Sequence, residues 1–501
     1  MRRILFLACV EILTAALAAA ATRPFPPALD AYIEKARSDW GVPGLAVVVV
    51  DGEGIVGAKG YGVRRLGAPE TIDENTHFDI ASLSKSFNAA MIATLVDEGK
   101  LHWDDRVRDV APQIVFPDSV RDSETTLRDL LAHRVALENG NLLIRLSGYD
   151  QAETFRRIRY FRPRGAFRAD FVYSNILYSV SEAMARAVTG KSWSALVRER
   201  LLVPLGMSDT NADENLDLPD AASPHARIDG VQQPVRHFRF ATVPPASGIV
   251  STPKDLATWL RFQLGDGTWN GKRIVSEASM EEMHSPQMLV SVPSAVLRSY
   301  DEEFFATYGF GWNVIDYRGR MMLWHSGNAD GMPSGMAVLP REKIGVAVLV
   351  NSWEGSGLPW ALTKRILDTL LGLPLRDGSA TALAERDRGE KRDAGELAER
   401  ERKRVAGTHP SVGLDAYAGV YVDRVFGDMA ITRDGDHLVL QFAHGQFADL
   451  FHWQYDTFAV RWRDPVFRED YPVLATFSLN DEGKPVRLEI PIRRDRIEAV
   501  R

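Results

Sequence analysis

Ser82-Leu-Ser-Lys85, continued by Ser86-Phe-Asn-Ala-Ala-Met-Ile-Ala-Thr-Leu95, is the stretch that decides the fold of this chain. Phe87, Met91 and Leu95 recur every fourth residue, which predicts a helix that begins near Ser82. Residues three apart on a helix share one face, so the Ser82 hydroxyl and the Lys85 amine can meet. A serine becomes a nucleophile when a base takes its proton, and a partly buried lysine can serve because desolvation lowers its pKa. Alone, this spacing also fits an N-cap serine with a surface lysine.

Apolar stretches on both sides of this helix predict a β-sheet. Leu45–Val50 and Ile55–Val63 predict a β-hairpin, because a glycine-rich turn lies between two extended runs. Between about residues 101 and 300 the pattern is mostly helical and rich in loops. Further strands are expected at Met321–Trp324, Gly335–Leu339 and Ile344–Val350, with a closing helix at Trp360–Leu371. We therefore expect an α/β fold whose antiparallel sheet is flanked by helices and holds an inserted helical subdomain.

The remainder of the chain differs in character. Residues 373–411 are charged and have almost no apolar face, which is typical of a solvated helix or a flexible linker. Short alternating strands with turn signals follow, as in His437–Phe442, and predict a small all-β barrel or sandwich. The expected organisation is a signal peptide at 1–21, a catalytic domain at 22–372, the linker at 373–411 and a β-domain at 412–501.

The first residues have the pattern of an export signal. Arg2 and Arg3 precede an apolar stretch, Ile4–Ala21, that ends in small residues suited to signal peptidase. Glu11 interrupts this stretch and makes it a poor membrane-spanning helix, although an uncleaved anchor is the alternative. We expect a periplasmic or secreted protein without stable membrane insertion. Cys9 is the only cysteine, so the mature chain would have no disulfide.

Composition and charge exclude several other classes of function. The chain has 501 residues, 45% of them hydrophobic and 25% charged, which fits a folded protein of two or more domains. The net charge of −7 argues against a general nucleic-acid binder, which needs an excess of Lys and Arg. No His-Glu-x-x-His motif or phosphate-binding glycine loop is present, and we expect no metal and no cofactor.

Two further motifs, together with the serine–lysine pair, indicate a known family. Tyr173-Ser-Asn175 precedes a predicted helix, and His325-Ser-Gly327 ends a predicted strand and is followed by Asn328. With these motifs the chain resembles the serine β-lactamase-like and penicillin-binding-protein-like hydrolases, a group with class C β-lactamases, D-alanyl-D-alanine carboxypeptidases, D-aminopeptidases and family VIII esterases. The resemblance covers about residues 27–371. Residues 412–501 are similar to the lipocalin-like accessory domain of some of these hydrolases.

The resemblance implies a role for each motif residue. Ser82 would attack a carbonyl carbon and form an acyl-enzyme, with Lys85 and Tyr173 sharing the role of base. Tyr173, as phenolate or through hydrogen bonds, would also activate the water that releases the acyl group. The backbone N–H groups of Ser82 and Asn328 would form the oxyanion hole. The remaining substrate-binding residues would be Asn175, which also holds Lys85, and His325 and Gly327 on the strand.

The chain departs from the family pattern at two places. His325 stands where β-lactamases have the lysine of Lys-Thr-Gly, and a histidine is mostly uncharged near neutral pH. This favours esterase or D-aminopeptidase relatives over β-lactamases, because a permanent charge helps to bind a substrate carboxylate. After His133, the family has a Ser/Thr-Gly pair but this chain has Val135-Ala136, so a different turn is an expectation to test.

The sequence leaves three functions and two further points open. The first function is a metal-free serine hydrolase that cleaves an ester, a small D-amino-acid peptide amide or a cell-wall fragment. The others are a catalytically inactive scaffold whose β-domain binds a ligand, and a true β-lactamase. A homo-oligomer is an open alternative, because relatives with such a β-domain can oligomerise. The arginines between 156 and 168 form either a patch for acidic substrates or a solvated surface with packed stems.

Overall fold

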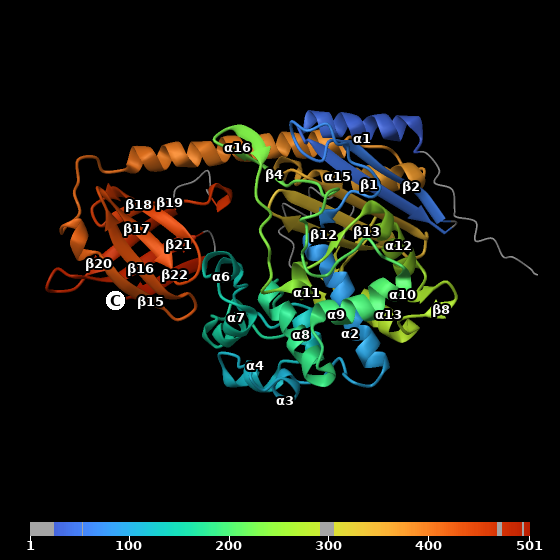
Figure 1. Ribbon diagram of the computed structural model, residues 1–501, viewed down its shortest axis with the longest axis horizontal. Helices are drawn as coiled ribbons and strands as arrows, with labels where there is room; N and C mark the ends of the chain where they lie inside the picture. Colours follow the sequence, from blue (N-terminus) through green and yellow to red (C-terminus); the bar gives the residue numbers. More distant parts are fainter. Residues whose placement is uncertain (1–24, 53, 291–304, 468–472, 493–494) are drawn as a thin grey trace, which may run out of the picture.

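The computed structural model describes residues 25–52, 54–290, 305–467, 473–492 and 495–501. It consists of an α/β domain and a β-barrel, which helix α16 (Gly378–Lys403) connects along one side of the molecule (Figure 1). The predicted signal peptide at 1–21 lies outside the described residues. No helix among those that are described is both long and apolar enough to cross a membrane.

The α/β domain is built on one antiparallel sheet of eight strands, which confirms the predicted fold class. In spatial order the strands are β2 (Gly54–Gly62), β1 (Gly44–Asp51), β14 (Ile344–Val350), β13 (Met332–Leu339), β12 (Arg320–Ala329), β11 (Asn313–Tyr317), β10 (Ala306–Tyr308) and β9 (Met288–Leu289). The two ends of the domain meet where the second strand of this order, β1, pairs with the third, β14, as in the pair Val48–Ala347. The predicted hairpin and the three later strands are all present.

Helices cover both faces of the sheet, which explains why β13 and β14 are buried along their whole length. One face packs on α1 (Pro27–Asp39) and α15 (Leu358–Leu370), and the other on α12 (Pro253–Leu264). Successive side chains of a strand point to opposite faces, so β1 divides its valines between two cores. The sequence analysis did not predict α1, whose buried residues are Leu29, Ile33 and Ala36.

The inserted helical region surrounds α2 (Ser84–Asp97), the helix predicted from the opening stretch. Every residue from Ser84 to Leu95 is buried, because α2 has neighbours on all sides and not on one stripe alone. The other helices of the α/β domain are α3 (Val107–Val110), α4 (Ser119–Glu124), α5 (Leu127–Leu131), α6 (Asn141–Leu146), α7 (Gln151–Arg157), α8 (Asn175–Thr189), α9 (Trp193–Val197), α10 (Val203–Leu205), α11 (Pro244–Ser247) and α13 (Glu277–His284). Three two-stranded sheets, β3–β6 (Phe78–Asp79, Val250–Ser251), β4–β5 (His225–Ile228, Val231–Pro234) and β7–β8 (Thr268–Trp269, Lys272–Arg273), complete it.

The turn after His133 has an unusual backbone. Ala136 has a φ of 56° and His133 a φ of 55°, both in the left-handed region that favours glycine. The turn is held from outside, because the Arg121 side chain donates to the Val135 carbonyl at 2.8 Å and the Arg164 N–H to the Ala136 carbonyl at 2.9 Å. The chain therefore adopts a glycine-type conformation without a glycine.

The C-terminal domain is a closed barrel of eight strands. Its interior is filled by apolar side chains, among them Tyr417, Tyr421, Phe442, Phe458 and Phe477, each at most 2% exposed. The strands are β15 (Gly419–Asp423), β16 (Gly427–Asp434), β17 (His437–Phe442), β18 (Phe447–Gln454), β19 (Thr457–Trp462), β20 (Val473–Leu479), β21 (Pro485–Ile492) and β22 (Asp495–Val500).

The arginine-rich segment 156–168 lies against this barrel. Arg162 binds Glu498 at 3.0 Å and Arg164 binds Asp495 at 3.3 Å. Arg157 donates to the backbone carbonyl of Arg424 at 3.0 Å. These arginines therefore join the barrel to the helical insertion, which argues against a patch that recruits acidic substrates.

Candidate active site

Ser82 and Lys85 meet as their spacing predicts. Ser82 lies in a single 3₁₀ turn, Ala81–Leu83, and Lys85 in the first turn of α2. The Lys85 Nζ is 3.2 Å from the Ser82 Oγ. Lys85 is 0% exposed, whereas Ser82 is partly exposed and can be reached by a substrate.

The hydrogen bonds of Lys85 orient its nitrogen toward the serine. Two carbonyl oxygens, Asn175 Oδ1 at 2.7 Å and the Ala246 backbone at 2.9 Å, each accept one N–H. Burial lowers the pKa of Lys85 well below its usual range. A neutral amine with two N–H groups used in this way presents its lone pair to Ser82.

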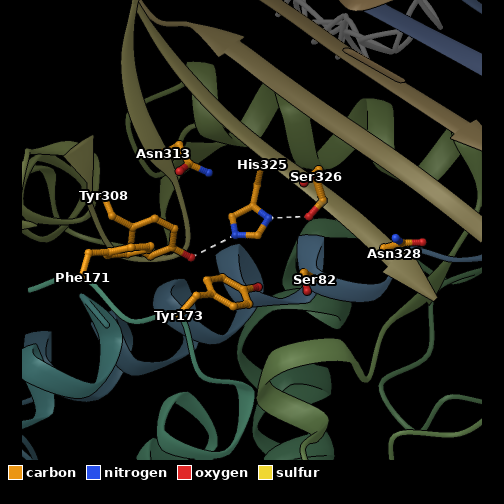
Figure 2. A pocket seen from close by; sticks show the side chains of 8 residues that line it. All are labelled: Ser82, Phe171, Tyr173, Tyr308, Asn313, His325, Ser326 and Asn328. Atoms are coloured by element: carbon orange, nitrogen blue, oxygen red, sulfur yellow. Dashed lines mark hydrogen bonds between the residues drawn. The ribbon is translucent and has the colours of Figure 1, made fainter. Parts of the chain in front are cut away.

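Tyr173 is the third of the predicted catalytic residues, and it lies in the loop before α8. Its hydroxyl points toward Ser82 (Figure 2), and burial raises the pKa of Tyr173 while a hydrogen bond with Ser82 opposes the increase. Ser174 caps α8 by accepting from the N–H of Leu177 at 3.3 Å. The raised pKa keeps Tyr173 a neutral phenol near neutral pH, which favours hydrogen bonding over phenolate formation.

His133 fixes this loop, a role that the sequence analysis did not assign. Its Nδ1 accepts a hydrogen bond from the Ser174 N–H at 3.2 Å, and its ring lies 4.3 Å from that of Tyr173. Burial lowers the pKa of His133 well below its usual value. In the sequence, the signal at this place was the family turn that follows His133.

His325 is held in one neutral form. Its Nδ1 is 2.7 Å from the backbone carbonyl of Ser326, which can only accept, so Nδ1 carries the proton. Its Nε2 therefore accepts from the Tyr308 hydroxyl at 2.9 Å (Figure 2). Burial lowers the pKa of His325 to about 3, and the nearby Lys85 contributes. One expectation is corrected: β12 does not end at His325 but continues to Ala329, so this histidine lies inside the strand.

Because Gly327 has no side chain, strand β12 can approach the 3₁₀ turn that carries Ser82. A Cβ at Gly327 would lie 2.1 Å from the Ser334 Oγ and 2.3 Å from the Ile80 carbonyl, so no side chain fits. Ala81, next to Ser82, has a φ of 47°, and its N–H donates to the Asp79 carboxylate at 2.7 Å. This close approach brings Asn328 and Ser82 to the same cavity.

The cavity in front of Ser82 has a volume of about 300 Å³ and is lined mainly by aromatic and polar side chains. Among the predicted site residues, Lys85, Asn175 and Gly327 do not line the cavity. Four lining residues were not predicted; Ser326 lies within the His325-Ser-Gly327 motif, whereas no motif marked Phe171, Tyr308 or Asn313. The lining consists of Ser82, Phe171, Tyr173, Tyr308, Asn313, His325, Ser326 and Asn328. Within the described ranges, no group of three or more His, Cys, Asp or Glu side chains could hold a metal ion.

Two family profiles match separate parts of the chain. A family profile described as Beta-lactamase matches residues 29–370. A second profile, described as a domain of unknown function (DUF3471), matches residues 403–499.

Characterised relatives are distant in sequence. The chain is 26% identical over 387 residues to Unguisins hydrolase ungD of Aspergillus violaceofuscus, covering 71% of this chain and 66% of that protein. It is 28% identical over 348 residues to Penicillin-binding protein 4 of Amycolatopsis lactamdurans, covering 67% and 88%.

Solved structures share the fold. The octameric penicillin-binding protein homologue from Pyrococcus abyssi superposes with a TM-score of 0.60 at 22% identity, over 94% of this chain and 99% of that one. The D-amino acid amidase from Ochrobactrum anthropi SV3 superposes with a TM-score of 0.57 at 21% identity, over 68% and 99%.

Proposed function

The chain belongs to the beta-lactamase family, and from this we propose that it is a serine hydrolase that forms an acyl-enzyme on Ser82 and cleaves an ester or a small peptide amide. One observation carries the proposal: the buried Lys85, whose pKa is lowered by burial, lies 3.2 Å from the Ser82 hydroxyl, with the Tyr173 phenol beside it. A binding scaffold needs no such arrangement.

Acylation follows from the hydrogen bonds. Neutral Lys85 accepts the Ser82 proton as Oγ attacks the carbonyl carbon. The backbone N–H groups of Ser82 and Asn328 stabilise the oxyanion, and removing one such donor typically costs about 3 kcal/mol in the barrier. Tyr173 donates its proton to the leaving group and recovers one from Lys85, so the alcohol or amine departs neutral.

Deacylation reverses these transfers with water in place of the leaving group. The water hydrogen-bonds to the Tyr173 oxygen and attacks the ester carbon, while its proton passes through Tyr173 to Lys85. Collapse of the second oxyanion releases the acid and returns a proton to Ser82. Because the pKa of Tyr173 is raised, Lys85 is the group that stores the proton in both halves of the cycle.

The charges around the cavity favour an uncharged acyl group. His325 is neutral, so it offers no cation to the carboxylate that β-lactams and D-alanyl-D-alanine peptides carry. None of the eight lining residues that the structure describes is an acid, so a free ammonium group has no partner there. We propose short-chain esters and uncharged amides as the substrate class.

The alternatives are weakened by separate observations. The packed interior of the barrel leaves the scaffold hypothesis without an internal binding site in that domain. The similarity to an octameric homologue supports proposing a homo-oligomer. We further propose that the protein is exported, on the basis of the sequence pattern of residues 1–21.

A substrate panel with a nucleophile control tests the function. We expect p-nitrophenyl acetate and butyrate to be hydrolysed faster than D-aminoacyl anilides, D-alanyl-D-alanine peptides and a chromogenic cephalosporin. Ser82→Ala should lower kcat/KM by about 10³-fold or more and abolish labelling by a fluorophosphonate probe. Folded wild-type protein that neither turns over a substrate nor is labelled would refute the hydrolase, and rapid cephalosporin hydrolysis would favour the β-lactamase.

A further inference from the structure

Helix α6 lies between the active site and the barrel (Figure 1). Its first residue, Asn141, accepts a hydrogen bond from the side-chain amide of Asn175 at 3.1 Å. Asn175 in turn accepts from Lys85 at 2.7 Å. The beginning of this short helix is therefore separated by one side chain from the lysine that we propose as the base.

The barrel holds the other end of α6. The Leu146 carbonyl accepts from the backbone N–H of Gln446 at 3.0 Å, and the Ser147 carbonyl accepts from that of His444 at 3.3 Å. A Cβ at Gly445 would lie 1.7 Å from the Leu146 oxygen. The turn between β17 and β18 is thus in backbone contact with the helix end, and no side chain fits between them.

Arg145 connects α6 to the strand that carries Asn328. Its two terminal nitrogens lie 3.0 and 2.6 Å from the carboxylate of Asp330, which is 3% exposed. Asp330 follows Asn328 by two residues, at the turn from β12 to β13. A bidentate guanidinium–carboxylate pair fixes the relative orientation of its partners. This ion pair therefore fixes the strand end that supplies the proposed oxyanion donor.

Three aromatic rings lie close to the same guanidinium. The ring centroids of Phe238, Phe240 and Phe467 lie 5.7, 5.4 and 5.4 Å from the Arg145 Cζ. Phe467 belongs to the barrel and also packs on Phe238 at 5.9 Å. Rings over a guanidinium attract it and exclude water, which strengthens its ion pair. The Arg145–Asp330 pair is therefore partly covered by the barrel.

We propose that Arg145 is a positioning residue of the hydrolytic reaction and that the docked barrel acts on the active site through it. The inference rests on the function proposed above. Arg145 is not among the residues that line the cavity, and it acts by holding Asp330 and thereby the N–H of Asn328. The oxyanion forms only in the transition state and the tetrahedral intermediate, so this effect belongs to kcat and leaves KM for a small ester unchanged.

The first test compares Arg145→Gln with Arg162→Gln as a matched control. Both changes remove a guanidinium at the interface with the barrel, but Arg162 pairs with Glu498 at the surface. On p-nitrophenyl acetate, Arg145→Gln should lower kcat roughly 100-fold with KM within about twofold, because a misplaced oxyanion donor loses most of its effect. Arg162→Gln should change kcat less than about twofold. Arg145→Lys should restore only part of kcat, since lysine cannot form the bidentate pair.

A barrel variant separates positioning from damage to the α/β fold. Gly445→Ala leaves Arg145 intact but adds a methyl group against the Leu146 carbonyl. We expect a lower kcat at unchanged KM, in a protein whose circular dichroism spectrum equals that of the wild type. Wild-type kcat in both Arg145→Gln and Gly445→Ala overturns the inference.

Amide hydrogen exchange gives a second readout that needs no activity. Exchange at residues 327–331 should increase in Arg145→Gln and Gly445→Ala but not in Arg162→Gln. Unchanged exchange in the first two variants overturns the role of Arg145. A wild-type protein without ester turnover or fluorophosphonate labelling refutes the proposed hydrolase instead, so the two failures are distinguishable.

Discussion

Burial sets the chemistry of single residues at this site. The Lys85 amine contacts Ser82, Asn175 and Ala246, and the side chain is 0% exposed, so burial disfavours its charged form. The pKa of Lys85 is therefore lowered, because lysine is charged when it is protonated. The same burial raises the pKa of Tyr173, because tyrosine is charged when it has lost its proton. Both effects favour the uncharged amine and phenol that the proposed mechanism requires.

The pH dependence of the reaction follows from Lys85. As the pH falls through its lowered pKa, Lys85 binds a proton and can no longer accept one, so kcat/KM for p-nitrophenyl acetate should decrease on the acid side. His325 has a pKa of about 3 and stays neutral at any higher pH. The pH profiles of wild type and His325→Gln should therefore share one acid limb. Lys85→Met should lower kcat/KM by roughly 10³-fold. If the acid limb of the profile moves or disappears in His325→Gln, the titrating group is the histidine and this prediction is wrong.

At the scale of elements, the turn from His133 to Ala136 carries backbone strain at a functional place. His133 holds the Tyr173 loop through Ser174, so the turn must keep this conformation. A left-handed backbone costs a residue with a Cβ about 1–2 kcal/mol relative to glycine. Contacts from Arg121 and Arg164 hold the turn despite this cost.

Paired glycine substitutions measure that strain. Ala132 and Ala136 are both 0% exposed, but Ala132 has a φ of −92° and Ala136 a φ of 56°. Ala132→Gly should lower the free energy of unfolding by about 1 kcal/mol, through lost chain entropy and a lost methyl group. In Ala136→Gly the relieved strain offsets this loss, so the free energy should stay within roughly 0.5 kcal/mol of wild type. Urea unfolding decides between this result and equal losses at both positions, which would show that Ala136 is unstrained.

Across the whole α/β domain, three buried histidines are fixed in the neutral form. One ring nitrogen of each accepts a hydrogen bond: His133 from the Ser174 N–H, His225 from the Leu66 N–H, and His325 from Tyr308. An imidazolium has no free lone pair and cannot accept. Burial accordingly lowers the pKa of all three.

Folding stability should therefore fall in acid. Below about pH 6.5 these histidines bind protons in the unfolded chain but not in the folded one, so the free energy of unfolding decreases as the pH falls toward the folded-state pKa values. Each contributes up to about 1.4 kcal/mol per pH unit in that window. Urea titrations of the α/β domain at pH 7.5, 6.5, 5.5 and 4.5 measure the slope. His225→Gln should reduce it, and a free energy that does not change between pH 6.5 and 4.5 would contradict the argument.

Local patterns in the chain were enough to predict the sheet, helix α2 and the all-β C-terminal domain, whereas the family resemblance supplied the motif residues beyond the Ser82–Lys85 pair. These features repeat over a few neighbouring positions, as in the apolar spacing of α2 or the Ser82–Lys85 pair, and backbone geometry alone converts such spacing into a shared face. Helix α1, which buries only Leu29, Ile33 and Ala36, was not predicted. The protonation of the site was only partly predictable, since it depends on burial.

The partners that complete the site come from segments with no pattern of their own. Tyr308 lies on a three-residue strand and orients His325, Asp330 reaches Arg145 across 185 positions, and Phe467 arrives from another domain. Their contacts arise when distant parts of the chain pack together, and packing depends on the combined shape of many side chains. The reacting groups could therefore be found by reading along the chain, while the groups that hold them in place became visible only in three dimensions.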